Sequence, residues 1–332
     1  MGNVRIRYFD IAKGIAILLV IMGHSVRIEV VSHFIFSFHM PLFFLISGFF
    51  FKKRPQEICI KINAKRLLVP YICTCIGVIL FHVLFLVCTG KADSVVQTTA
   101  RYFFASLYGS GADQQSPFYI PQIGAVWFLL ALFFVLIIFN SIVELKYYFA
   151  VVLILAYVGY KTSQFLWLPF SIQSALVSLF FFAVGYECRR NHLLEKKISV
   201  WWIGVIFSVW VLAFLYGGQL NLVSCYFGNG LFDIIGALCG SYIVLRFSML
   251  LEKVTFVNHL MEFIGRNTLP ILCFHLIELN TFPWGEIREM YIQSGFGYFG
   301  LFALTVKYAW VFLMLGVAYL IPAFRKIYGK NS

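Results

Sequence analysis

Residues 36–50 read FSFHMPLFFLISGFF, and this stretch decides the class of fold. It is apolar enough to lie in a membrane, yet it contains His39, Pro41, Ser47 and Gly48. A polar side chain in hydrocarbon is unfavourable unless it has a partner or a task, so an imidazole here asks for an explanation.

The composition of the whole chain agrees with this stretch. Of the 332 residues, 61% are hydrophobic, 19% are aromatic and 12% are charged. Soluble domains carry about 25% charged residues, so no water-soluble surface can be built from this composition. The chain is therefore expected to be an integral membrane protein.

The apolar stretches are long enough to be membrane-spanning helices, which need about 20 residues each. They lack the alternation of barrel strands, so we expect an all-α polytopic membrane protein with about ten transmembrane helices in one bundle. The expected spans are 10–28, 32–51, 67–89, 126–145, 147–168, 170–188, 198–216, 231–250, 264–283 and 297–322. We expect residues 1–332 to form a single transmembrane domain without a separate soluble domain. The basic segment 52–66 is expected to be an inner loop and 90–125 an ordered outer one.

The distribution of the 26 Lys and Arg residues sets the expected orientation. Most of them fall in alternate connections, which places both termini in the cytoplasm by the positive-inside rule. The net charge of +12 then reflects topology and contact with membrane lipids, and no nucleic-acid partner is expected. The eight cysteines show neither a disulfide framework nor zinc spacing, and no metal site is expected.

The first expected helix carries ionisable residues on one face. Lys13 and His24 are eleven residues apart, close to three helical turns, and lie roughly 16 Å apart along the axis. Asp10 precedes Lys13 by three residues and can pair with it. This face therefore offers a cation near the inner rim and an imidazole in the outer half.

The second expected helix returns inward and brings His39 to a depth similar to that of His24, because the joining loop is short. Two imidazoles at one level form a candidate acid/base or nucleophile pair. Hydrogen bonding between helices is the structural alternative. Pro41 predicts a kink, and Ser47 and Gly48 predict a close helix approach.

The ninth expected span repeats the theme with His275 and Glu278, which are three residues apart and share a helix face. The carboxylate could orient the imidazole or hold its proton. The alternatives are a hydrogen bond between helices or a glutamate wetted at the outer rim.

These residues resemble a known family, the bacterial membrane acyltransferases of the acyltransferase-3 family, especially the fucose 4-O-acetylase-like O-acetyltransferases. FDIAKGIAILLVIMGHS (9–25) is similar to the family's first-helix signature, in which a basic residue is followed by a histidine. FSFHMPLFFLISGFF is similar to its Phe-His-Met-Pro and Ser-Gly element. Softer matches are KRLLVPY (65–71), AVWFLLALF (125–133), FFFAVGYECRR (180–190) and IGRNTLPILCFH (264–275).

The resemblance implies an acyltransferase of the bacterial inner membrane that moves an acyl group, usually acetyl, from cytosolic acetyl-CoA or another acyl-CoA. The implied acceptor is a hydroxyl of a cell-surface or exported carbohydrate, in a polysaccharide modification. His24 would act as general base or take the acyl group covalently, and His39, His275 and Glu278 would assist.

The basic residues of the inner rim suit the phosphates of coenzyme A. Lys13, Lys61, Lys65 and Arg66 are the candidates, with Asp10, Ser47 and Gly48 in support. Family members often carry two arginines three residues apart in this region, whereas Asn63 stands three positions before Arg66 here.

Two other functions fit the same sequence. A transporter or flippase for a lipid-linked sugar would also contain membrane-embedded histidines, although no internal repeat is visible and transporters often have one. A sensor or assembly protein would use the polar residues only to hold the helices together.

Overall fold

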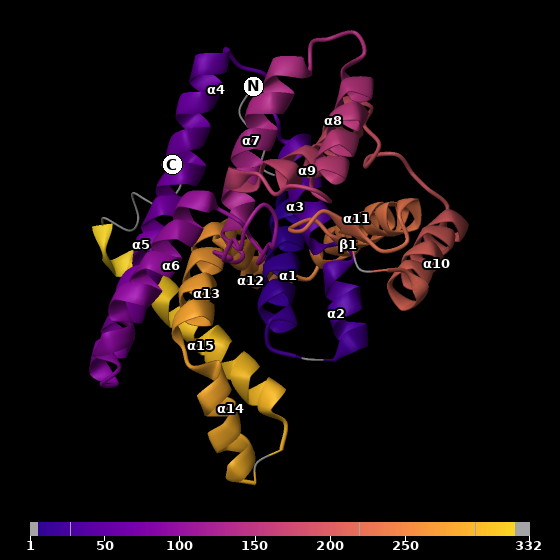
Figure 1. The fold of residues 1–332 in the computed structure, drawn as a ribbon. Coiled ribbons are helices and arrows are strands. Elements are labelled where there is room, and N and C mark those ends of the chain that lie inside the picture. Colours follow the sequence, from indigo (N-terminus) through magenta and orange to yellow (C-terminus); the bar gives the residue numbers. More distant parts are fainter. Residues whose placement is uncertain (1–5, 27, 219, 296, 323–332) are drawn as a thin grey trace. The chain divides into compact units, whose positions relative to one another are not determined.

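A computed structural model describes residues 6–26, 28–218, 220–295 and 297–322 of the chain. The chain divides into two compact units, 1–52 with 178–268 and 53–177 with 269–332. Figure 1 traces the elements from α1, in indigo, to α15, in yellow.

The first unit consists of helices and one small hairpin. Its elements are α1 (Arg7–Gly23), α2 (Glu29–Phe36), α3 (His39–Phe49), most of α9 (Ile172–Arg190), α10 (Val200–Tyr216), β1 (Leu220–Asn221), β2 (Tyr226–Phe227), α11 (Leu231–Leu251) and α12 (Thr255–Arg266). The two strands pair antiparallel, with Leu220 opposite Phe227 and Asn221 opposite Tyr226. The helices α1, α3 and α11 contact one another around a buried apolar core that includes Phe9, Leu42 and Leu245.

The second unit is helical except for one isolated β-bridge among its described residues. Its elements are α4 (Gln56–Asn63), a π-helical turn (Ala64–Leu68), α5 (Val69–Cys88), a 3₁₀ turn (Ala92–Ser94), α6 (Val95–Tyr108), α7 (Trp127–Ile142), α8 (Tyr148–Thr162), a 3₁₀ turn (Pro169–Ser171), α13 (Thr268–Thr281), α14 (Trp284–Gln293) and α15 (Phe299–Leu320).

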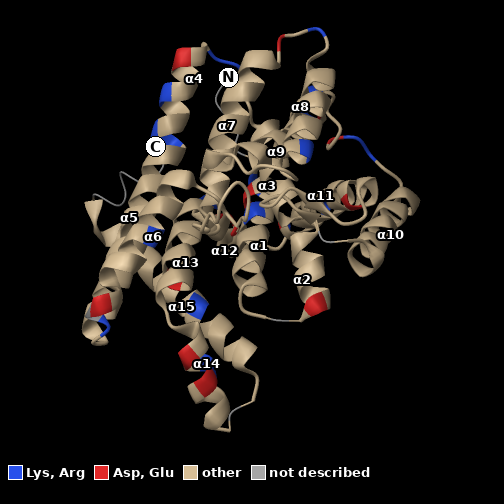
Figure 2. Ribbon diagram, in the orientation of Figure 1, with Lys and Arg blue, Asp and Glu red and all other residues tan. Residues whose placement is uncertain are grey.

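Each of the ten apolar segments expected from the sequence contains a helix. Within the described residues, five helical segments are long and apolar enough to cross a membrane, the first of them formed by α2 and α3 together: Glu29–Phe49, Gln56–Cys88, Pro169–Arg190, Leu231–Leu251 and Phe299–Leu320. Three shorter helices, α7, α8 and α10, are also apolar. The positions of Lys, Arg, Asp and Glu, coloured on the ribbon in Figure 2, are sparse along the helices. The structure thus agrees with an all-α membrane protein, and the count of ten spans stays a prediction.

The segment expected as one helix at 32–51 is broken between α2 and α3. Phe38 leaves the helical conformation, with φ −138° and ψ −24°, and Leu42 N–H donates to its carbonyl as the new helix begins. Pro41 is the third residue of α3, where its missing N–H would have no intrahelical partner in any case. The segment expected at 264–283 breaks in the same way at Asn267, and Pro270 is the third residue of α13.

The basic segment 52–66, expected as a loop, is mostly helical. From Gln56 it continues through α4 and the π turn into α5, so that Gln56–Cys88 forms 33 residues of helix. Asn140 of α7 holds the start of this helix, because its side-chain oxygen accepts from Arg54 N–H at 3.1 Å and its amide donates to Arg54 O at 3.0 Å. These two hydrogen bonds between Asn140 and Arg54 explain why this segment does not form an open loop.

The expectation that the aromatic segment 90–125 is ordered is confirmed. It contains α6, and its phenol groups donate inside the second unit: Tyr102 to Asn280 O at 3.3 Å and Tyr108 to Trp167 O at 2.5 Å. All eight cysteines are free, as the lack of a disulfide framework predicts.

Candidate functional site

His24 and His39 both lie at helix ends in the first unit, one at the end of α1 and the other at the start of α3. His24 is the residue that ends α1 and is exposed, whereas His39 is 5% exposed. The ring of Phe36 stands next to both imidazoles, with centroids 6.4 Å from His24 and 5.1 Å from His39. Phe36, a residue that sequence reasoning missed, is therefore a common neighbour of the two candidate histidines.

Each imidazole makes a hydrogen bond of the same type, from Nδ1 to the backbone carbonyl four residues earlier. Nδ1 of His24 lies 2.8 Å from Val20 O, and Nδ1 of His39 lies 2.8 Å from Ile35 O. A carbonyl oxygen can only accept, so Nδ1 carries the proton in each ring and Nε2 carries the lone pair of the neutral form. Nε2 is thus the nitrogen that could take a proton from a substrate.

This hydrogen bond alone does not define a site. His259, exposed on α12, makes the same contact with Thr255 O at 2.8 Å. His24 and His39 differ from His259 because they share an aromatic neighbour and come together from two helices. Their environment, more than the bond itself, marks them as the candidate site.

Lys13 and Asp10 form the ion pair that the sequence predicts, with 2.7 Å between Nζ and Oδ1. Asp10 is buried, and the side chain of Lys13 is one-fifth exposed. The turn that carries them packs tightly on α12: a Cβ on Gly265 would collide with Asp10 O, and one on Gly14 would lie 2.5 Å from Met261 O. These two glycines therefore let α12 bury the carboxylate that fixes Lys13.

Gly48 serves a similar contact between α3 and α9. A Cβ at Gly48 would collide with Phe182 O, and one at Gly185 would collide with Leu45 O. The neighbouring Ser47 donates to Phe43 O of its own helix at 2.8 Å, so its hydroxyl makes an intrahelical bond. The close approach depends on the glycines and positions the helix that begins with His39.

His275 and Glu278 belong to a buried ionic network in the second unit. Nδ1 of His275 lies 3.0 Å from Glu278 Oε2, and neither side chain has exposed area. Lys307 of α15 approaches Glu278 Oε1 at 2.9 Å, and Trp284 donates to the same oxygen at 2.6 Å. The ammonium also lies 4.5 Å from the centroid of the Trp284 ring, a cation–π contact.

Sequence reasoning missed Lys307 and Trp284. Lys307 is a lone cation in an apolar 22-residue helix and is 2% exposed. The rule that singles out His24, that an ionisable side chain inside a span marks a site or a buried pair, would have found it. The network gives Glu278 an ammonium, an indole N–H and an imidazole as partners, and it fixes Nδ1 of His275 as the nitrogen that faces the carboxyl group.

Lys61, Lys65 and Arg66 are exposed on α4 and the π turn, while Asn63 between them is buried and donates to Cys59 O at 2.9 Å. Lys61 and Lys65 are four residues apart and share a face. The position that departs from the arginine pattern of the family therefore faces the interior. An exposed basic face is compatible with phosphate binding.

An apolar, helical chain with an aromatic-bridged imidazole pair and a second buried histidine network defines an integral membrane protein with candidate acid/base groups. The sequence profile of the acyltransferase domain family Acyl_transf_3 matches residues 6–325. The chain belongs to this family and is a membrane acyltransferase. Neither a curated protein nor a solved structure matches it significantly.

Proposed function

We propose that this protein transfers an acyl group, most simply acetyl, from acyl-CoA to a hydroxyl of a carbohydrate destined for the cell surface, as fucose 4-O-acetylase-like enzymes do. The observation that carries the proposal is the placement of His24 and His39, from two helices, beside the one ring of Phe36. Nδ1 of both imidazoles bonds a carbonyl, so Nε2 is the basic nitrogen. Family membership favours acyl transfer over the transport of a lipid-linked sugar.

His24 is the general base in this proposal, because it is the accessible member of the pair. Its Nε2 takes the proton of the acceptor hydroxyl as that oxygen forms a bond to the acyl carbonyl carbon. The carbon–sulfur bond of the thioester then breaks, and the coenzyme A thiolate leaves and takes up a proton. The acceptor is left as an ester. General base catalysis of this kind typically contributes about 10²–10⁴-fold to the rate.

The other residues of the site support this step. His39, buried beside Phe36, tunes the environment of the base or polarises the carbonyl, and His275 with Glu278 provides a second oriented imidazole. Lys13, Lys61, Lys65 and Arg66 supply positive charge for the phosphates of acyl-CoA. We place the enzyme in the bacterial inner membrane with both termini in the cytoplasm, so that the donor is cytosolic.

The test compares His24→Ala with His259→Ala in purified protein in detergent, using radiolabelled acetyl-CoA and extracted surface polysaccharide. His259 is the matched control because its Nδ1 makes the same bond at an exposed position. We expect His24→Ala to lose at least about 99% of the transfer and His259→Ala to keep it. More than about a tenth of the activity remaining in His24→Ala would exclude the base role.

The same two variants can be expressed in cells, where mass spectrometry measures the base-labile acetate on surface glycans. Loss of acetate in a deletion strain, restored by the wild-type and His259→Ala proteins and not by His24→Ala, supports the proposal. Unchanged acetylation with less total glycan would instead indicate transport.

A further inference from the structure

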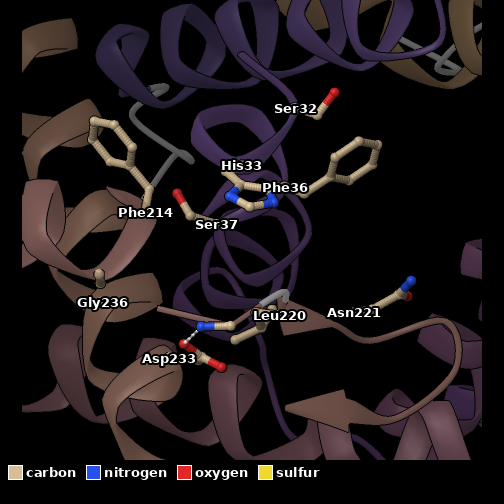
Figure 3. A pocket seen from close by; sticks show the side chains of 11 residues that line it. Ser32, His33, Phe36, Ser37, Phe214, Leu220, Asn221, Asp233 and Gly236 are labelled. Atoms are coloured by element: carbon tan, nitrogen blue, oxygen red, sulfur yellow. Dashed lines mark hydrogen bonds between the residues drawn. The ribbon is translucent and has the colours of Figure 1, made fainter. Parts of the chain in front are cut away.

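The first unit contains a pocket of about 250 Å³ between α2, α10, α11 and the β-hairpin. Figure 3 shows Ser32 and His33 of α2, with Ser37 just after its end, on one side of the pocket, and Asp233 of α11 on the opposite side. Pockets that hold drug-sized ligands are usually about 300–1,000 Å³, so this one suits a ligand no larger than a single ring.

The polar groups of the pocket include donors and acceptors from separate elements. Asp233 is 4% exposed and accepts from Gly218 N–H at 3.0 Å and Asn229 N–H at 2.7 Å. A carboxylate has about four acceptor positions, so two backbone bonds leave it capacity for hydroxyl donors. Asn221 accepts from Val223 N–H at 3.1 Å through Oδ1, which leaves its amide as the donor.

Serine and histidine side chains complete the lining. Ser37 accepts from Trp210 Nε1 at 2.9 Å and donates to Phe34 O at 2.8 Å, so its position is fixed. His33 lines the pocket from the next turn and can donate or accept with a neutral ring. A pocket with one carboxylate, an amide, hydroxyls and an imidazole between aromatic walls matches a polyhydroxylated ring better than an apolar ligand.

One wall of the pocket is the ring of Phe36. This is the ring whose centroid lies 5.1 Å from that of His39 and 6.4 Å from that of His24. A ligand in the pocket would therefore be separated from the imidazole pair by one aromatic side chain. This placement suits a substrate whose recognised part lies in the pocket. Its reacting hydroxyl would then extend past Phe36 toward His24.

We propose that this pocket binds one sugar ring of the carbohydrate acceptor, with Asp233, Asn221 and His33 reading its hydroxyl groups. The inference rests on the proposed function for the identity of the ligand. It assigns acceptor recognition to the pocket and leaves proton transfer to His24.

The experiment uses the full-length protein in detergent and four probes, the methyl glycosides of glucose, galactose, mannose and fucose. Binding is measured by saturation-transfer NMR without donor, and acylation is measured with acetyl-CoA. Ser32→Trp places an indole at the pocket lining, and Val30→Trp is the matched control, because Val30 is on α2, is 55% exposed and does not line the pocket. Both variants are first checked for the elution profile and melting temperature of the wild type.

We expect at least one glycoside to bind the wild-type protein, Ser32→Trp to lose that signal and to raise the acceptor KM at least tenfold, and Val30→Trp to behave as wild type. A Ser32→Trp protein with binding and KM within twofold of wild type overturns the pocket assignment while the acyltransferase proposal stands. Glycoside binding that Ser32→Trp abolishes, without any acylation by wild type, supports the pocket and refutes the proposed reaction. No saturation transfer to any of the four glycosides overturns the pocket assignment.

Discussion

The ring of Phe36 meets the imidazole of His39 at an interplanar angle of 71°, with 5.1 Å between centroids. Because the same ring also approaches His24 and lines the neighbouring pocket, one apolar side chain connects three features of the first unit. We regard it as the residue that fixes the two imidazoles relative to each other.

Phe36→Leu should therefore lower kcat by about tenfold or more, since small displacements of catalytic groups can cost up to about 10²-fold. Phe34→Leu is the matched control: Phe34 is also on α2, but it packs against Trp210 and Phe38. Steady-state kinetics with acetyl-CoA and polysaccharide measure the difference. Equal kcat values for the two variants would remove Phe36 from the site.

Lys13→Ala should raise the KM for acyl-CoA more than the KM for the acceptor, since Lys13 is proposed to bind phosphate. Asp10→Asn removes the carboxylate partner at 2.7 Å that fixes Lys13 but keeps the lysine, so it should weaken the affinity for the donor less than Lys13→Ala does. Isothermal titration with coenzyme A provides the direct measurement. A larger effect on the acceptor KM in Lys13→Ala would assign Lys13 elsewhere.

Lys307→Met should destabilise the protein by about 3–5 kcal/mol, because it leaves the buried carboxylate of Glu278 without its cation. The double variant Glu278→Gln/Lys307→Met removes both charges and should recover most of that loss. Thermal unfolding of the purified proteins tests this coupling. Additive losses in the double variant would show that the two side chains do not stabilise each other.

Gly48→Ala should destabilise the first unit by about 1–3 kcal/mol or more, because the new methyl group collides with Phe182 O, a backbone atom with little freedom to move. Gly204→Ala in α10 is the control, since a Cβ there meets nothing within 4 Å. Its helix should be stabilised slightly, by about 0.5–1 kcal/mol. Melting temperatures in detergent distinguish the two, and a Gly48→Ala protein as stable as Gly204→Ala would contradict the close packing.

Hydropathy predicts the positions of the helices well, because each apolar segment must satisfy its own backbone hydrogen bonds in lipid. It predicts their breaks poorly. Pro41 predicts a kink, but the continuous apolar run around it gives no sign that the helix stops at Phe36 and begins again at His39. The start of the helix at Gln56 is missed for the opposite reason, because its sequence is polar and resembles a loop. Asn140, far along the chain, stabilises that start.

For the candidate site too, the sequence indicates some residues and not others. Ionisable residues inside apolar segments identify His24, His39, His275 and Glu278 from sequence alone. The partners that orient them, Phe36 and Trp284, are common types of residue in membrane helices and give no such signal. The pocket brings together residues almost 200 positions apart, from Ser37 to Asp233, so only tertiary structure reveals it.

The 33 helical residues of Gln56–Cys88 extend about 50 Å at about 1.5 Å per residue, whereas the hydrocarbon layer is about 30 Å thick. An upright helix of this length would extend beyond the hydrocarbon layer, and we expect its polar first third, with Lys61 and Lys65, to be the part outside it. The π turn at Ala64–Leu68 is where helices bend most readily. Because Asn140 of α7 holds the start of this helix, its charged end has a fixed position beside α7, and any bend at the π turn is set by that contact.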